Sequence, residues 1–321
     1  ILSGHARAQR SIEAVRVAHQ YFIKPFSTRD LIDALALTHS LYKKIRNPGL
    51  QGLIASIDRL PTPRKLYYEI SSCLNDPNTT VQTIAEIICT DTGISSKLLQ
   101  VANSAFFGQS QPVDDIHQAV NVLGIDTIRS LVLIAGIASD HKEVLGGLIS
   151  VDLYSNHCVD VAVVCQWIAK QLGYSVRHQN ALFTVGLLHD VGKLIMLKKY
   201  AEIYTEKGWS EDPYTAKLHI GQIERLSTDY PEIGAALIAL WGLPTSVVNA
   251  IAHFKEPHNI ELDEHRYACI VHVADAISNH RKRGGGTRFS EGGRIDTQAL
   301  RKAGFDHDFD RWYDESIGAS F

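Results

Sequence analysis

A histidine followed directly by an aspartate lies inside an apolar segment of the chain. The pair is His189-Asp190, within Gly186-Leu-Leu-His-Asp-Val-Gly-Lys193. The flanking residues from Ala181 to Ile195 have the apolar spacing of a helix. Burying an imidazole and a carboxylate together is costly unless they are paired, hydrogen-bonded or bound to a metal. The segment therefore predicts a metal site on a largely buried helix.

Other segments carry side chains that could join this pair at one metal ion. His157 and Asp275 each lie within an apolar, helical segment, and His253 follows a third one. Imidazole and carboxylate ligands together suit iron, manganese, zinc, nickel or magnesium. We therefore expect one divalent metal ion, held by His157, His189, Asp190 and Asp275, with His253 as a fifth candidate ligand.

Each candidate also has an ordinary structural explanation. His157 could be a surface or hydrogen-bonded core histidine, and Asp190 could cap a local kink. Asp275 could hydrogen-bond to backbone at a helix junction. Lys193, one turn after His189, could extend out of the core rather than meet an anionic phosphate as a point charge. In an enzyme, Asp190 would accept a proton and Lys193 would counter the developing charge.

Composition is that of an ordinary globular protein and excludes some classes of function. The 321 residues are 45% hydrophobic and 21% charged, with a net charge of −3. This charge gives no strong attraction to nucleic acid or membrane, and no apolar run reaches the roughly 20 residues of a membrane span. Five cysteines without a Cys-x-x-Cys pair predict reduced, buried thiols and a cytoplasmic location. The length allows two or three domains.

The first 46 residues predict a short α/β unit. Residues 1–4 and 21–26 have the pattern of buried strands, and residues 9–18 have helical periodicity. Ser27 is placed to cap a second helix that extends to Ile45. The order strand, helix, strand, helix indicates a parallel pair of strands.

After a turn at Asn47-Pro48-Gly49, nearly everything up to residue 281 predicts helix. We expect a helix capped by Thr79 and ended by Gly93. Further helices are expected at 94–105, 114–123 (ended by Gly124), 128–138 (capped by Asp126) and 151–172 (ended by Gly173). Residues 281–286 predict a flexible linker, and the tail contains one short helix candidate at 296–303.

Residues 1–46 resemble the C-terminal two-fifths or so of a response-regulator receiver domain, a flavodoxin-like fold. Ser3 matches that family's switch hydroxyl, and Lys24-Pro25 matches the fifth-strand lysine that contacts the phosphoryl group. The resemblance implies that the phosphate-accepting aspartate lies upstream of Ile1. It also implies a sensor histidine kinase as the upstream partner.

From about Leu53 to Asn279 the chain resembles the HDOD branch of the HD superfamily of metal-dependent phosphohydrolases. The matching segments are Leu60-Pro-Thr-Pro63, Val101-Ala-Asn-Ser-Ala-Phe-Phe-Gly108, Ala119-Val-Asn-Val-Leu-Gly124, Arg129-Ser-Leu-Val-Leu133, Leu187-Leu-His-Asp-Val-Gly-Lys193 and Glu232-Ile-Gly-Ala-Ala-Leu-Ile-Ala-Leu-Trp-Gly-Leu-Pro244. The resemblance implies a mainly α, multi-helical bundle and supports the ligand set of His157, His189, Asp190 and Asp275.

Departures from the family pattern favour one metal over two. Tyr230-Pro231 stands where a histidine often precedes the Glu-x-Gly-Ala segment, and His253-Phe254 stands where two histidines are frequent. The Gly-Tyr-Pro signature of relatives that hydrolyse cyclic di-GMP is missing. A two-metal phosphodiesterase is therefore not favoured.

The preferred interpretation is a signalling protein with three parts. These are a partial receiver domain (1–46), an HDOD domain (47–283, divided into 47–150 and 151–283) and a tail (284–321). The HDOD domain would bind a partner protein or a nucleotide ligand. The alternative is a single-metal phosphohydrolase acting on a phosphate ester or nucleotide. A nucleic-acid-binding role is not favoured, because no basic helix with interleaved aromatic residues is present.

Overall fold

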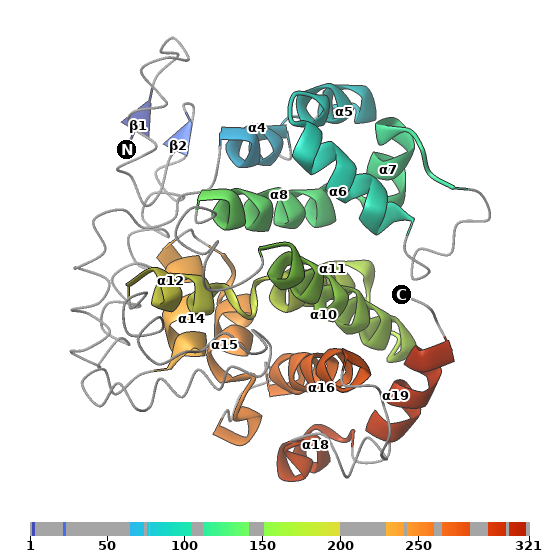
Figure 1. The fold of residues 1–321 in the computed structure, drawn as a ribbon, viewed down its shortest axis with the longest axis vertical. Helices are drawn as coiled ribbons and strands as arrows, with labels where there is room; N and C mark the ends of the chain where they lie inside the picture. The colour runs from blue at the N-terminus through green and yellow to red at the C-terminus, as the bar shows by residue number, and fades with distance from the viewer. Residues whose placement is uncertain are drawn as a thin grey trace.

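The computed structural model of the chain is a helical assembly preceded by two short strands (Figure 1). It describes residues 2–3, 22–23, 65–73, 76, 78–103, 112–140, 151–199, 229–240, 243–259, 265–282, 295–305 and 308–318. The mainly helical fold predicted for the part after residue 46 is confirmed within these ranges.

The described helices between residues 65 and 140 lie together as a first layer (Figure 1). They are α4 (Lys65–Cys73), α5 (Val81–Cys89), α6 (Thr92–Ala102), α7 (Ile116–Leu123) and α8 (Ile125–Asp140). Side-chain caps start three of them, because Thr80, Asp91 and Asp115 accept backbone N–H groups of α5, α6 and α7. Gly124, with φ 73°, ends α7 as predicted.

The limits of three of these helices differ from the prediction. Thr80, not Thr79, caps α5. Gly93 does not end that helix, because it lies in the first turn of α6 with its N–H on the Asp91 carboxylate. Asp126 lies inside the first turn of α8 and is not its cap.

The second layer holds the predicted metal ligands. It contains α10 (Val151–Gln171), α11 (Val176–Leu188), α12 (Val191–Lys199), α14 (Tyr230–Leu240), α15 (Thr245–His253), the 3-10 helix η3 (Pro257–Asn259) and α16 (His265–Lys282). Gly173, with φ 69°, follows the end of α10.

The single helix predicted across residues 181–195 is wrong, because the chain breaks at His189 and Asp190 between α11 and α12. His189 Nδ1 donates to the carbonyl oxygen of Gly186 at 2.6 Å. A carbonyl at the C-terminal end of a helix has no intrahelical partner, and here the ligand side chain supplies one. The break therefore places both members of the pair at a helix terminus.

Two glycines allow the backbones around this break to approach closely. A Cβ atom on Gly186 would lie 2.7 Å from Ala162 Cα of α10, and one on Gly192 would lie 1.8 Å from the Tyr230 carbonyl oxygen of α14. Both distances are too short for any side chain. Glycine is therefore required where α11 packs on α10 and where α12 packs on α14.

Among the described residues after α16 are the helices α18 (Thr297–Ala303) and α19 (Phe309–Gly318), which lie beside α16 in Figure 1. The helix predicted at 296–303 is confirmed, with Asp296 as its N-cap. The helix α19 was not predicted. The linker predicted from residue 281 is wrong at its start, because α16 continues to Lys282.

At the N-terminus, β1 (Leu2–Ser3) and β2 (Phe22–Ile23) pair in parallel, with Leu2 opposite Phe22. Ser3 thus lies in β1. The predicted helices at 9–18 and 27–45, Lys24 and the turn at 47–49 lie outside the described residues. Two strands of this length do not identify a receiver domain, which stays a prediction along with the domain limits.

None of the described helices is by itself long and apolar enough to cross a membrane. The helices α7 and α8 reach the required length and composition only as a pair, and they are bent by 108° relative to one another.

The five cysteines form no disulfide. Cys158, Cys165 and Cys269 are buried, as predicted for reduced thiols, and Cys73 is half-buried. Cys89 differs from the prediction, because it is exposed at the end of α5.

Candidate metal centre

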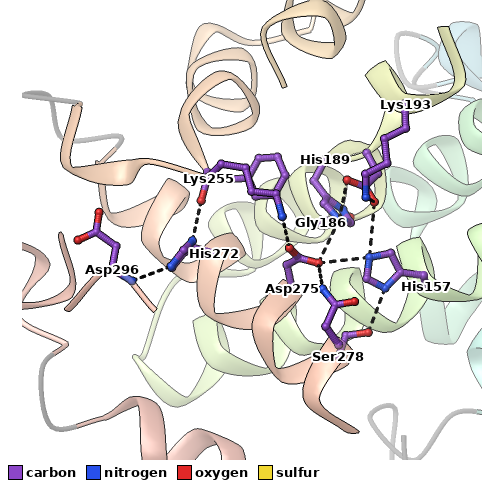
Figure 2. Close-up of polar contacts among 12 residues, drawn as sticks. His157, Gly186, His189, Lys193, Lys255, His272, Asp275, Ser278 and Asp296 are labelled. Atoms are coloured by element: carbon purple, nitrogen blue, oxygen red, sulfur yellow. Dashed lines mark hydrogen bonds and ion pairs between the residues drawn. The ribbon is translucent and has the colours of Figure 1, made fainter. Parts of the chain in front are cut away.

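Four buried side chains from three segments meet in the second layer (Figure 2). His157 comes from α10, His189 and Asp190 from the break after α11, and Asp275 from α16. Nε2 of His157 lies 3.3 Å from Asp275 Oδ1 and 3.6 Å from Asp190 Oδ2. Nε2 of His189 lies 3.4 Å from Asp190 Oδ1 and 3.7 Å from Asp275 Oδ1. The four side chains predicted to act together therefore surround one point.

Hydrogen bonds on the far side of each imidazole aim its Nε2 atom at this point. His189 Nδ1 donates to the Gly186 carbonyl, and His157 Nδ1 lies 3.1 Å from Ser278 Oγ. The two rings meet edge to face, 5.2 Å apart. Partners of this kind fix the orientation of histidines that bind metals.

Two polar atoms at the centre lack hydrogen-bond partners among the described residues. They are Nε2 of His189 and Oδ1 of Asp190, both fully enclosed. Buried polar atoms are rarely left in this state unless an ion, a water or a ligand completes the site. The residues present therefore fit a metal: ligand atoms of His157, His189 and Asp275 lie within 4.8 Å of one another, and their types suit a divalent cation.

Two lysines hold the outer carboxylate oxygens. Lys193 Nζ lies 2.5 Å from Asp190 Oδ2, and Lys255 Nζ lies 2.7 Å from Asp275 Oδ2. Asn279 Nδ2 also donates to Asp275 Oδ1 at 2.7 Å. Sequence reasoning found Lys193 but missed Lys255. The signal is weak there, because Lys255 lies in the turn after α15, where no periodic pattern marks it.

Aromatic rings line the same region. The Tyr230 ring centroid lies 4.9 Å from Lys193 Nζ and 6.0 Å from Lys255 Nζ. Lys255 also lies over the Phe254 ring at 4.8 Å. Phe254 in turn meets the His189 ring edge to face at 5.2 Å. Both ammonium groups therefore lie close to the ring of Tyr230, beside the candidate ligands.

Burial and the neighbouring charges shift the pKa values of the four candidate ligands. Burial lowers the pKa of His157 despite the neighbouring carboxylates. Burial opposes protonation of His189 too, but Asp190 and Asp275 outweigh it and raise the pKa of His189 to about 9. Despite burial, His189 and Lys193 hold the pKa of Asp190 well below its usual value, and Lys255 does the same for Asp275. Both carboxylates are thus ionised and able to bind a cation.

His253, the fifth candidate ligand, lies apart from the other candidate ligands. His253 is half-buried in the last turn of α15, where burial lowers its pKa. Within the described part of the chain, it does not belong to the group of ligand atoms around Asp275.

Comparison with known proteins identifies a family. The model of the HDOD domain family matches residues 60–257, well over half of the chain. Among solved structures, a Shewanella amazonensis SB2B protein, named provisionally as a phosphohydrolase, has a TM-score of 0.61 at 23% identity, covering 85% of this chain and 95% of that one. An HDOD domain protein of unknown function from Geobacter sulfurreducens has a TM-score of 0.57 at 20% identity, covering 87% and 90%. At such identities the likeness concerns the fold alone.

Curated relatives match over parts of their length. A Treponema pallidum (strain Nichols) protein without characterised function is 26% identical over 209 residues, which are 63% of this chain and 39% of that protein. The 3'3'-cGAMP-specific phosphodiesterase 1 of Vibrio cholerae is 36% identical over 72 residues, 22% of this chain and 15% of that enzyme. The chain thus spans less than half the length of either relative.

Proposed function

The chain belongs to the HDOD family, and from this we propose that its buried centre holds one divalent metal ion and acts on a phosphate-bearing ligand as a phosphohydrolase-type site. The observation that carries the proposal is the convergence of two imidazoles and two ionised carboxylates, at the middle of which His189 Nε2 and Asp190 Oδ1 make no hydrogen bond to a described residue. A purely structural polar cluster would be expected to satisfy those atoms internally.

The roles of the side chains follow from their positions. His157, His189, Asp190 and Asp275 would hold the metal, which supplies a bound water of lowered pKa and a compensating positive charge. Lys193 and Lys255 each contact the Oδ2 atom of one carboxylate, while Oδ1 of Asp275 faces both histidines and Oδ1 of Asp190 faces His189. The same ammonium groups are placed to attract phosphate oxygens.

The depressed pKa of Asp190 bears on its predicted role as proton acceptor. A carboxylate that resists protonation binds a cation well but takes up a proton poorly. This favours ligation as the main role of Asp190.

Metal content is the test of this proposal. Protein purified without chelator or histidine tag would be analysed by plasma mass spectrometry beside the double variant His189→Ala with Asp190→Ala. His178→Ala, at an exposed position of α11, is the matched control. About one metal ion per chain, lost in the double variant and kept in the control, would support the site and justify screening phosphate esters. Wild-type protein that takes up no metal would refute it.

A second candidate is a signalling output module, favoured by the parallel pairing of β1 with β2. This pairing suits the receiver-like unit proposed for residues 1–46, with Ser3 and Lys24 as its switch residues and a sensor histidine kinase upstream. Its state would reach the HDOD helices and alter binding of a partner protein or nucleotide. Removing residues 1–46 should then change partner binding or oligomeric state. Unchanged behaviour of both would rule out the coupling.

A further inference from the structure

The carboxylates and the lysines of the centre balance one another in charge. The carboxylates of Asp190 and Asp275 carry two negative charges, and Lys193 and Lys255 carry two positive charges at contact distance. Metal binding requires neutral imidazoles, so the histidines add no charge to the loaded state. A divalent cation would therefore give the centre a net charge of plus two, at a place where uncompensated charge is costly.

Lys255 differs from Lys193 in its access to solvent. The side chain of Lys255 is 39% exposed, whereas that of Lys193 is 16% exposed. Lys255 extends from the turn after α15, and its Nζ atom reaches inward to Asp275. The Tyr230 ring lies near both ammonium groups. Of the two lysines, Lys255 is thus the more accessible to an incoming ligand.

We propose that Lys255 makes the metal-loaded centre select a dianionic phosphate monoester over a monoanionic diester. This inference rests on the proposed function and specifies its substrate class. A monoester carries close to two negative charges at neutral pH, which match the two positive charges of the loaded centre. A diester carries one and leaves one charge uncompensated in a partly buried site.

A neutral donor in the same region does not make this distinction. The Tyr154 hydroxyl on α10 is buried beside Cys158 of the same helix. Burial raises the pKa of this phenol, and Cys158 and then Asp190 add to the shift, so Asp190 is one of its neighbours. A neutral hydroxyl can donate to a phosphate oxygen of either ester. A preference for the monoester over the diester must therefore come from the charged groups of the centre.

Two acidic residues, Asp229 and Glu256, flank Tyr230 and Lys255 in the sequence. Asp229 precedes Tyr230, but its carboxylate turns to the start of α14 and accepts the N–H of Glu232 at 3.2 Å. Glu256 follows Lys255 and lies in the field of Asp229. Despite burial, Asp275, Asp190 and then Asp229 raise the pKa of Lys255. Asp229 therefore weakens the charge match at the centre but favours the charged form of Lys255.

The test compares two ligands that differ by one charge. Phenylphosphonate is a non-hydrolysable dianion above about pH 8, and its monomethyl ester is a monoanion of nearly the same shape. Binding of each to Mn²⁺-loaded protein would be measured by calorimetry for wild type, Lys255→Met and Lys255→Arg. Lys170→Met, in the last turn of α10, is the charge-matched control. Thermal unfolding and Mn²⁺ affinity of each variant are measured first.

The expected result is a preference of wild type for the dianion that falls about tenfold in Lys255→Met, while Lys255→Arg and Lys170→Met retain it. Lys255→Met should also bind Mn²⁺ at least as tightly as wild type, because a competing cation on Asp275 is gone. Equal binding of both ligands by wild type, or an unchanged preference in Lys255→Met, would overturn the inference while leaving the metal site intact. Failure of wild type to bind Mn²⁺ at all would overturn the proposed function and the inference together.

Discussion

His272 joins the neighbourhood of the metal centre to the C-terminal helices (Figure 2). Its Nδ1 atom donates to the Phe254 carbonyl at 2.9 Å, and its Nε2 atom accepts the backbone N–H of Asp296 at 2.9 Å. Only the neutral ring can do both, since a proton on Nε2 would face another N–H group. Burial and the charge of Lys255 lower the pKa of His272, in agreement with this geometry.

This geometry predicts a loss of stability in acid. The unfolded chain binds a proton to His272 near pH 6.5, whereas the folded protein resists it. The contribution of the neutral ring is therefore complete above that pH and is lost as the pH falls below it. Unfolding free energies of wild type and His272→Gln, measured by urea denaturation across this range, should converge on acidification. A difference that stays constant with pH would contradict the prediction.

Ser278 is expected to tune metal affinity without contacting the metal. Its hydroxyl lies 3.1 Å from His157 Nδ1 and orients that ring. Replacement by alanine should weaken Mn²⁺ binding about 10- to 100-fold and change thermal unfolding little. Ser316→Ala, at a buried serine remote from the ligands, is a suitable control. Equal Mn²⁺ affinity of wild type and Ser278→Ala would show that His157 needs no such support.

At the residue scale, the sequence predicted the four side chains that meet, because ligand-type residues in apolar segments are conspicuous. Whether they bind metal stays a prediction. Lys255 could not be predicted, since its importance comes from a turn that brings it to Asp275 across the fold. The separation of His253 from the group also depends on which way the last turn of α15 faces.

At the element scale, two glycine contacts hold the helices that carry the ligands. Gly192→Ala would place a methyl group against the Tyr230 carbonyl, so α12 and α14 must separate. We expect a loss of about 1–3 kcal/mol in unfolding free energy, with weakened Mn²⁺ binding. Gly93→Ala is the control, because its Cβ would meet nothing closer than 3.4 Å. It should be neutral or stabilising by up to about 1 kcal/mol.

Helix ends were predictable where glycine adopts a positive φ, as at Gly124 and Gly173. The break at His189 could not be predicted, because the apolar pattern before it, in α11, continues after it in α12. The helix α19 was missed for another reason. Its buried residues Trp312, Tyr313 and Ser316 are interrupted by charged ones, so the apolar stripe is short.

At the scale of the whole molecule, the C-terminal helices are part of the folded body. His265 Nε2 lies 3.0 Å from the Ala299 carbonyl, and His280 Nδ1 lies 2.7 Å from the Tyr313 hydroxyl. Arg281 donates to the Ser316 carbonyl at 2.6 Å. These three partners lie in α18 or α19, so the C-terminal helices hold the helix that carries Asp275 in place.

Trp312 is the largest buried side chain of this contact and packs on Phe305 at 5.4 Å. Trp312→Ala should lower the unfolding free energy by about 3–5 kcal/mol, as measured by urea denaturation. If the C-terminal helices folded independently of the other helices, Trp312→Ala would instead leave the main urea unfolding transition of the protein unchanged. Arg311→Ala, at an exposed neighbouring position, is expected to have little effect.

The alkylation rate of a buried thiol of α10 can measure how often the candidate metal centre opens. Cys158 and Cys165 lie on the helix that carries His157, and Cys165 lies directly against Gly186 of α11. Burial raises the pKa of Cys165 well above its ordinary value, so the closed protein presents no reactive thiolate there. Alkylation of Cys165 must therefore wait until α10 and α11 part. Its rate would report how often the ligand-bearing helices separate, while exposed Cys89 is alkylated in the closed protein and serves as an internal reference.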